Sequence, residues 1–316
     1  MTGSDSAGAS GASGASGASG ASGAADAVAR HTGSEPVDTR PLGGDAVAAR
    51  LDARDGSHGR AGTVVAKRGA GPNAAAAEGA GLRWLAEPGV VPVPHVHGWD
   101  DDWLVLDYVE PGRPTPEGAE AFGRGLAALH LSGAPAFGCP PPDGPADAWI
   151  GLTGMSNRPH DDWPTFYARE RIRPYVRAAV DQGLFDRDDA AVFDTVCDRL
   201  PELQPGDEPP ARLHGDLWSG NVHWGEDGAV WLIDPAAHGG HRETDLAMMH
   251  LFGVPQLDRV LGAYAEAAAE AGRPLAERHE DRVPLHQLFP LLVHTVLFGG
   301  GYAGQALAAA RRALRS

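Results

Sequence analysis

The sequence predicts an α+β protein with two lobes, a small sheet-rich N-lobe and a larger, mostly helical C-lobe. Short apolar, β-prone runs bounded by Gly and Pro concentrate in the first third of the chain. Beyond them, apolar residues recur mostly at helical spacing. The 316 residues are 42% hydrophobic, which is enough for the cores of two lobes. We place the N-lobe at 25–106 and the C-lobe at 107–316.

The first 24 residues are expected to form a disordered tail. A Gly-Ala-Ser repeat runs from Ala7 to Gly23 without an aromatic or branched apolar residue, and such a segment buries too little surface to order itself. It also lacks the basic start and apolar stretch of a secretion signal. The folded part should therefore begin near Val28 to Asp38.

A glycine pair follows in what reads as a strand, a turn and a strand. The turn residues are Leu42 to Asp45, the next strand is Ala46 to Leu51, and Asp55-Gly56 follows. Gly43 and Gly44 could let backbone N–H groups approach a phosphate. An ordinary hairpin turn explains the pair equally well, since the chain has 43 glycines.

Lys67 is the only lysine in the chain, and the other 25 of the 26 basic residues are Arg. It follows the apolar run 63–66, where a kinase places the lysine that reaches the α- and β-phosphates. A compact ammonium suits that position better than the planar fork of Arg. Glu78, in a helical segment from Asn73 to Leu85, is the expected partner of this lysine.

An apolar strand is predicted from Trp103 to Glu110 and ends before Pro111-Gly112. The end of this strand suits a hinge between the lobes. Main-chain groups near Asp107 and Val109 could pair with an adenine edge, because flat ligands in apolar clefts are often oriented by a few backbone bonds.

The C-lobe should consist mostly of helices. Helical spacing marks Phe122, Leu126 and Leu129, and also the segments 163–180 and 285–314. The apolar run from Leu288 to Phe298 is too short to span a bilayer and should be a buried helix.

The most informative segment is the polar run from His214 to Asn221, followed by the strand-like run 230–233 and Asp234. In kinase chemistry a loop Asp accepts the proton of the attacking hydroxyl, an Asn five residues later holds magnesium, and an Asp after the next strand holds magnesium too. Asp216, Asn221 and Asp234 have this order and spacing. Flanking β-prone runs at 222–224 and 230–233, separated by a Gly-containing turn, predict a hairpin.

Three neighbours of this motif have expected roles. His214 should brace the loop rather than transfer protons. Asp245 could accept backbone N–H bonds from the loop, with capping of a helix N-terminus as the alternative. Trp218 is a large aromatic inside the loop, which suits packing or stacking on a substrate.

Composition excludes several classes of protein. A net charge of −16 argues against nucleic acid or an anionic membrane as the main partner. Cys139 and Cys197 have no metal-ligand spacing and form no disulfide framework, which suits a reducing cytoplasm. The His pairs at 95 and 97 and at 238 and 241 lack companions at zinc spacing, so no transition-metal site is expected.

These motifs together resemble the fructosamine kinase (ketosamine kinase) family, a branch of the aminoglycoside-phosphotransferase-like enzymes with the protein-kinase-like fold. The resemblance covers about residues 40 to 312 in order. Its matching segments are 104–106, 126–130, 149–151 with Asn157 and Trp163, 214–221, 234–236, 239–243, 245–248, 251–253, and His294 with 298–302. Two departures are the absence of a small polar residue around Ala46 to Ala48, and Met155-Ser156 in place of the usual Pro-Gln.

The resemblance implies ATP and Mg²⁺ as cofactors, with Asp216 as base, Asn221 and Asp234 as magnesium ligands, and Lys67 with Glu78 on the phosphates. It also implies a sugar hydroxyl of a ketosamine as acceptor, on a small molecule or a glycated protein side chain, with Trp218 near the sugar. Deglycation in the cytoplasm would be the purpose. An aminoglycoside or amino-alcohol phosphotransferase of the same fold remains an alternative. A nucleotide-binding pseudokinase is a further one, against which the complete set of site residues argues.

Overall fold

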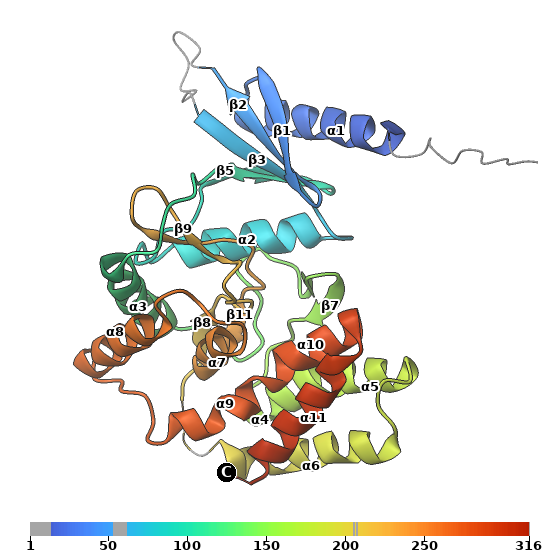
Figure 1. The fold of residues 1–316 in the computed structure, drawn as a ribbon, viewed down its shortest axis with the longest axis vertical. Coiled ribbons are helices and arrows are strands. Elements are labelled where there is room, and N and C mark those ends of the chain that lie inside the picture. The colour runs from blue at the N-terminus through green and yellow to red at the C-terminus, as the bar shows by residue number, and fades with distance from the viewer. Residues whose placement is uncertain (1–13, 53–61, 205, 207, 316) are drawn as a thin grey trace, which may run out of the picture.

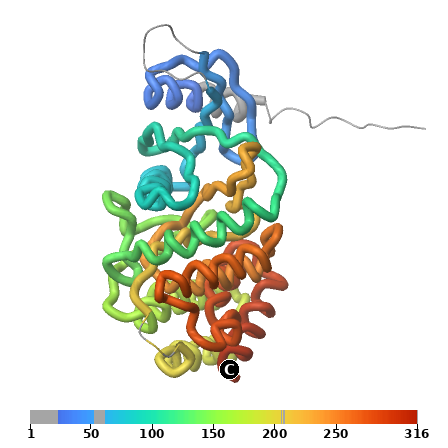
Figure 2. The backbone as a smooth tube through the Cα atoms, turned by 90° about the vertical axis from the view of Figure 1, so that its left-hand side faces the viewer, coloured from blue at the N-terminus to red at the C-terminus, as the bar shows by residue number. Residues whose placement is uncertain are grey.

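The computed structural model describes residues 14–52, 62–204, 206 and 208–315. Two lobes lie one above the other, with the sheet of the N-lobe at one end and the C-terminus at the far end of the helical C-lobe (Figures 1 and 2). The α+β architecture with two lobes is therefore confirmed. Within the described residues, no helix is long and apolar enough to cross a membrane.

The N-lobe is built on a five-stranded antiparallel sheet with the order β1-β2-β3-β5-β4. Its strands are β1 (Asp38–Gly43), β2 (Ala46–Leu51), β3 (Gly62–Arg68), β4 (Val96–Trp99) and β5 (Trp103–Asp107). The hairpin of β1 and β2 and the strand containing Lys67 appear where the sequence predicts them. The expected Asp55-Gly56 lies outside the described residues.

A different helix covers each face of this sheet. On β3, Val64 and Ala66 pack with α1 (Gly14–Thr32), whereas Val65 between them packs against the cluster that includes α2 (Ala74–Ala86). This follows from strand geometry, because successive side chains point to opposite faces. The predicted helix that bears Glu78 is α2.

The helix α1 corrects the expectation of a disordered tail over residues 1–24, because the structure is helical from Gly14. Residues 1–13 lie outside the described part. Ala24, Ala27 and Val28 recur at helical spacing and are buried against the sheet beside Trp103. Small side chains let this helix lie close to the sheet, and sheet contacts rather than its own composition stabilise it. Arg30 also pairs with Asp100 at 2.7 Å.

In its described part, the C-lobe contains helices around three two-stranded sheets. Its strands are β6 (Asp147–Ile150), β7 (Thr153–Ser156), β8 (Ala211–Leu213), β9 (Val222–Trp224), β10 (Val230–Leu232) and β11 (His238–Gly240). Its main helices are α3 (Pro116–Leu131), α4 (Trp163–Phe166), α5 (Arg173–Asp181), α6 (Arg187–Leu203), α7 (Glu243–Phe252), α8 (Leu257–Glu270), α9 (Val283–His286), α10 (Leu288–Phe298) and α11 (Gly301–Ala313).

Most helical predictions in this lobe hold, with local departures. The predicted helix around Phe122 is α3, and α10 is largely buried as expected. Between α4 and α5 the chain forms a π-helix, Tyr167–Ile172, and near the C-terminus a short 3₁₀ turn, His279–Arg282, precedes α9. The π-helix contains Arg171, whose buried guanidinium bonds Ser156 O and the Asn157 side chain. Hydropathy spacing alone does not reveal such a buried cation.

Candidate active site

The loop from His214 to Asn221 connects β8 to β9, and the side chain of Asp245 accepts hydrogen bonds from its backbone. The Asp245 carboxylate, 1% exposed, accepts the backbone N–H groups of His214 at 2.8 Å and Gly215 at 3.0 Å. It also lies 3.2 Å from Nε2 of His130. The helix α7 begins earlier, after Arg242. The loop-binding role predicted for Asp245 is therefore confirmed, and the capping alternative is wrong.

His214 braces the same loop, as predicted. Its Nε2 lies 2.9 Å from Ile233 O, so the imidazole ties the loop to the end of the β9–β10 hairpin. Burial lowers the pKa of His214, and the ring is therefore neutral at physiological pH. The hairpin itself pairs Val222 with Leu232 and Trp224 with Val230, which confirms the predicted strands.

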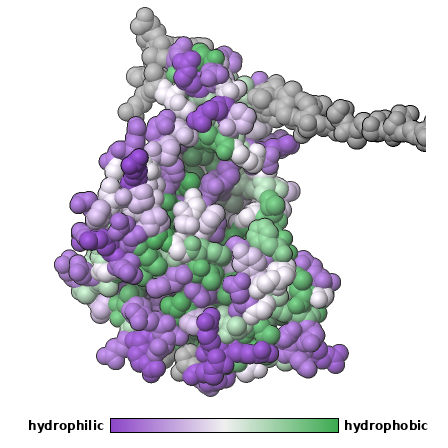
Figure 3. All heavy atoms as spheres, in the orientation of Figure 1, coloured by the Kyte–Doolittle hydropathy of each residue, from purple (hydrophilic) through white to green (hydrophobic). Residues whose placement is uncertain are grey.

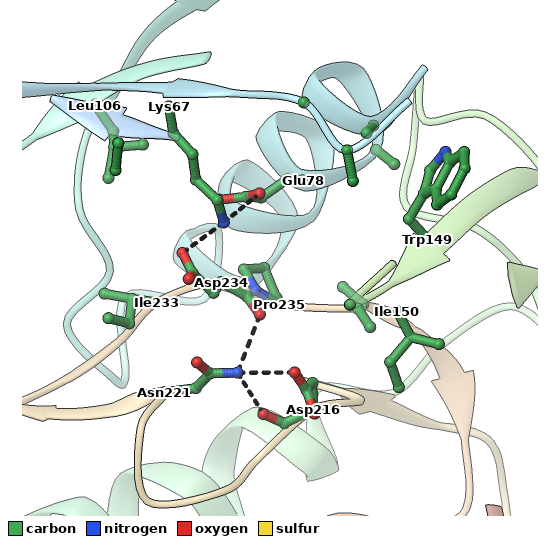
Figure 4. Close-up of a pocket in the computed structure, with 18 of the residues that line it drawn as sticks. Lys67, Glu78, Leu106, Trp149, Ile150, Asp216, Asn221, Ile233, Asp234 and Pro235 are labelled. Carbon is green, nitrogen blue, oxygen red and sulfur yellow. Dashed lines mark hydrogen bonds and ion pairs between the residues drawn. The ribbon is translucent and has the colours of Figure 1, made fainter. Parts of the chain in front are cut away.

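Asn221 connects the two ends of this loop. Its Nδ2 donates to the main-chain oxygen of Asp216 at 2.8 Å, to Asp216 Oδ2 at 3.0 Å and to Asp234 O at 3.3 Å (Figure 4). These bonds fix the orientation of the amide, and its carbonyl oxygen Oδ1 has no hydrogen-bond partner among the described residues. Burial raises the pKa of Asp216 to about 6, opposed by the bond from Asn221.

Lys67 reaches from β3 to two carboxylates on separate elements. Its Nζ lies 2.8 Å from Glu78 on α2 and 3.0 Å from Oδ1 of Asp234 (Figure 4). Burial would lower the pKa of Lys67, but the two carboxylates raise it above its ordinary value, so the ammonium stays charged. Asp234 has φ of 52°, a left-handed conformation that is costly for a non-glycine residue and is typical of functional sites.

One cavity of about 760 Å³ lies between the lobes and is lined by Lys67, Glu78, Asp216, Asn221 and Asp234. Figure 3 shows hydrophobic residues gathered in the hollow there. The cavity brings together every residue that the sequence singled out as a site candidate: Gly43, Gly44, Lys67, Glu78, Asp107, Val109, Asp216, Trp218, Asn221 and Asp234.

The glycine pair and the hinge form the upper walls of the cavity. Gly43 and Gly44 have φ of 117° and 54°, and a Cβ on either would meet open space. Glycine is therefore favoured at both positions by the positive φ, and not because a neighbouring atom leaves no room for a Cβ. At the hinge, Asp107 N–H donates to His95 O at 2.9 Å and Val109 O accepts from His223 Nε2 at 3.1 Å.

A third wall, the hairpin of β6 and β7, was not predicted as part of the site. Trp149 and Ile150 lie across the cavity from Lys67 (Figure 4), and Met155 and Asn157 also line it. Trp149 Nε1 donates to Pro72 O at 2.9 Å, which ties this C-lobe hairpin to the N-lobe. A Cβ at Gly71 would overlap the same indole. Only the family motif around Trp149 and Asn157 could have indicated this wall from the sequence.

Among the residues that the structure describes, one buried group of possible metal ligands lies outside the cavity. Ligand atoms of His241, Glu243 and His286 lie within 4.8 Å of one another. However, both Glu243 oxygens accept from Arg282 at 2.9 and 2.6 Å, and His241 Nδ1 accepts from the N–H of Glu243. Metal binding through Nε2 of His241 would require a proton on that Nδ1, so this group fits a hydrogen-bonded core.

The N-lobe is sheet-rich, the C-lobe is helical, and an ion-paired lysine and a loop Asp line the cavity between them. This combination defines a phosphotransferase with the protein-kinase-like fold. Residues 47–316 match the model of the fructosamine kinase family. The chain belongs to the fructosamine kinase family and is a kinase.

Known relatives agree with this membership. A protein of Thermus thermophilus named as a ketoamine kinase is 37% identical over 231 residues, 72% of this chain and 78% of the relative. A crystal structure named as a fructosamine-3-kinase of Thermobifida fusca YX-ER1 is 44% identical, with a TM-score of 0.81, covering 92% of this chain and 97% of that one. Choline kinase LicA of Streptococcus pneumoniae has a TM-score of 0.56 at 13% identity, covering 92% and 96% of the two chains, which shows the fold alone.

Proposed function

We propose that this protein transfers the γ-phosphoryl group of ATP to a sugar hydroxyl of a ketosamine, a fructosamine or a ribulosamine, and that it serves in deglycation. Family membership supports the acceptor class. The observation that supports the chemistry most strongly is the convergence of Lys67, Asp216, Asn221 and Asp234, from three separate segments, on one cavity.

The nucleotide would occupy the upper half of this cavity. Adenine would lie beside the hinge at Asp107 and Val109, and the main chain of Gly43 and Gly44 would cover the phosphates. Lys67 would bind the phosphate oxygens as a compact positive charge. Its bond to Glu78 at 2.8 Å orients the ammonium group.

Asn221 and Asp234 fit a magnesium ion, because hard cations bind amide and carboxylate oxygens. The bonds donated by Asn221 Nδ2 leave the carbonyl oxygen of this amide as the atom for a metal. Asp234 adds a carboxylate on the same side of the cavity as Lys67. Magnesium bound there would neutralise charge that develops on the phosphate oxygens.

Asp216 would accept the proton of the acceptor hydroxyl as its oxygen attacks the γ-phosphorus and ADP leaves. The bond from Asn221 fixes the orientation of this carboxylate. Trp218, two residues further along the loop, would contact the sugar, since aromatic faces pack well against sugar rings.

The test is a phosphotransfer assay with mass-spectrometric detection over ribulosyl-amine, fructosyl-amine, free sugar and aminoglycoside acceptors. We expect a phosphate adduct on at least one ketosamine, and none with Asp216→Asn, while that variant still binds ATP. Phosphorylation of an aminoglycoside with no ketosamine product would overturn the proposal.

A further inference from the structure

A continuous group of aromatic side chains leads from the cavity to the outer surface of the C-lobe. The rings of Trp218 and Phe252 have centroids 6.5 Å apart, and Phe252 lies 4.7 Å from the ring of His294. His294 in turn contacts Phe298 at 5.4 Å and Tyr302 at 5.0 Å. We call these five residues the aromatic rim.

Two residues of the rim are exposed, and glycines shape both of its ends. Trp218 is 41% exposed and Phe298 is 66% exposed, among the largest exposures of apolar side chains in the described residues. The indole of Trp218 lies over Gly220, where a Cβ would overlap the ring. At the other end, Gly299 and Gly300 have positive φ and separate α10 from α11, which brings Phe298 and Tyr302 together at 6.1 Å.

The rim is continuous with the cavity at Trp218. Trp218 lines the cavity together with Asp216. Leu152 also lines the cavity and is 74% exposed, and a Cβ on the neighbouring Gly151 would lie 3.3 Å from Leu297, the residue before Phe298. A molecule whose hydroxyl reaches Asp216 while nucleotide fills the N-lobe side would therefore extend outward over the rim.

The rim also has a defined chemistry. Trp, Phe and Tyr side chains bear no charge, and burial lowers the pKa of His294, which keeps its imidazole neutral. The rim therefore offers apolar area and ring faces, without a cation that could pair with a carboxylate. Aromatic faces bind apolar groups and attract cations such as a protonated amine.

We infer that the aromatic rim binds the substituent on the acceptor's amine nitrogen, and that it selects aliphatic or aromatic substituents over those bearing a carboxylate. The inference rests on the proposed function, because it assumes an amine-linked sugar at Asp216. Rim residues beyond Trp218 then determine specificity without touching the reacting atoms. Their contribution should be expressed mainly in kcat/KM for bulky acceptors.

The test compares three ketosamines that share one sugar and differ only in the amine substituent: N-methyl, N-benzyl and N-carboxymethyl. For the unaltered protein we expect kcat/KM to be highest with N-benzyl and lowest with N-carboxymethyl. Phe298→Ala combined with Tyr302→Ala should lower kcat/KM for the N-benzyl acceptor by about tenfold and change the N-methyl value by less than about twofold.

Two further variants sharpen the test. Phe298→Lys should raise kcat/KM for the N-carboxymethyl acceptor relative to N-benzyl, because it adds the cation that the rim lacks. Val37→Ala is the matched control, since Val37 is 48% exposed but precedes the N-lobe sheet, and it should alter none of the three values.

Equal kcat/KM for the three acceptors in the unaltered protein, or an equal loss for all three in the double variant, would overturn the inference about the rim. Such a result leaves the proposed function standing, because ketosamines would still be phosphorylated. Absence of product with all three acceptors would contradict the proposed function itself.

Discussion

Replacing Asp245 by Asn should destabilise the protein and misplace its catalytic loop. The carboxylate accepts two backbone N–H groups, from His214 at 2.8 Å and Gly215 at 3.0 Å. An amide has only one oxygen, so one buried donor loses its acceptor and faces an NH₂ group instead. Hydrogen bonds to a charged group contribute about 1.5–3 kcal/mol each. We therefore expect the free energy of unfolding to fall by about 2–4 kcal/mol.

Urea unfolding followed by circular dichroism measures this change, and steady-state kinetics measures the effect on the loop. Since Asp216 directly follows Gly215, kcat should fall more than the KM for ATP rises. Asp258→Asn, at an exposed position in α8, is the control and should change the unfolding free energy by less than about 0.5 kcal/mol. If Asp245→Asn matched that control in both unfolding and turnover, the loop would not depend on this carboxylate.

Three other predictions concern the metal, the lysine and the N-terminal helix. Asp234→Asn should lower activity by several orders of magnitude, and unchanged magnesium-dependent ATP binding by calorimetry would remove Asp234 from the site. Lys67→Arg should lower kcat nearly as much as Lys67→Met, about 10²-fold or more, and near-normal turnover of the Arg variant would refute the need for a compact ammonium. Ala27→Asp puts a charge where the side chain is 0% exposed and should lower the unfolding free energy by several kcal/mol. Asp26→Ala, at the exposed neighbouring position, is the control and should leave the unfolding free energy nearly unchanged. Equal thermal midpoints for the two variants would show that α1 contributes little to stability.

The sequence predicts the two-lobed fold and singles out residues that line one cavity, because both depend on local patterns. Lys67 follows an apolar, strand-like run, and Asp216 and Asn221 lie on a loop that precedes two short β-prone runs. Each of these patterns lies within a short continuous stretch of the chain. The meeting of Lys67 with Asp234 follows from the fold, which places β3 above the end of the β9–β10 hairpin.

Contacts between segments that lie far apart in the sequence cannot be predicted from local sequence patterns. The first twelve residues of the helix α1, 14–25, are all Gly, Ala or Ser, which suggests disorder, and its contact with Trp103 and the sheet accounts for its stability. The wall formed by Trp149 contacts Pro72, which lies 77 residues earlier in the chain. Similarly, the π-helix at Arg171 depends on a buried guanidinium and two polar partners, and hydropathy spacing contains no information about such partners.

The central claim is that a ketosamine is the acceptor, and the specificity constant tests it most directly. The measurement is kcat/KM of the purified protein for a ribulosyl- or fructosyl-amine, for the free sugar and for kanamycin, at saturating ATP and magnesium. We predict a value for a ketosamine at least about a hundredfold above either competitor, about 2.7 kcal/mol of transition-state binding. A kanamycin value equal to or above the ketosamine value would contradict the account.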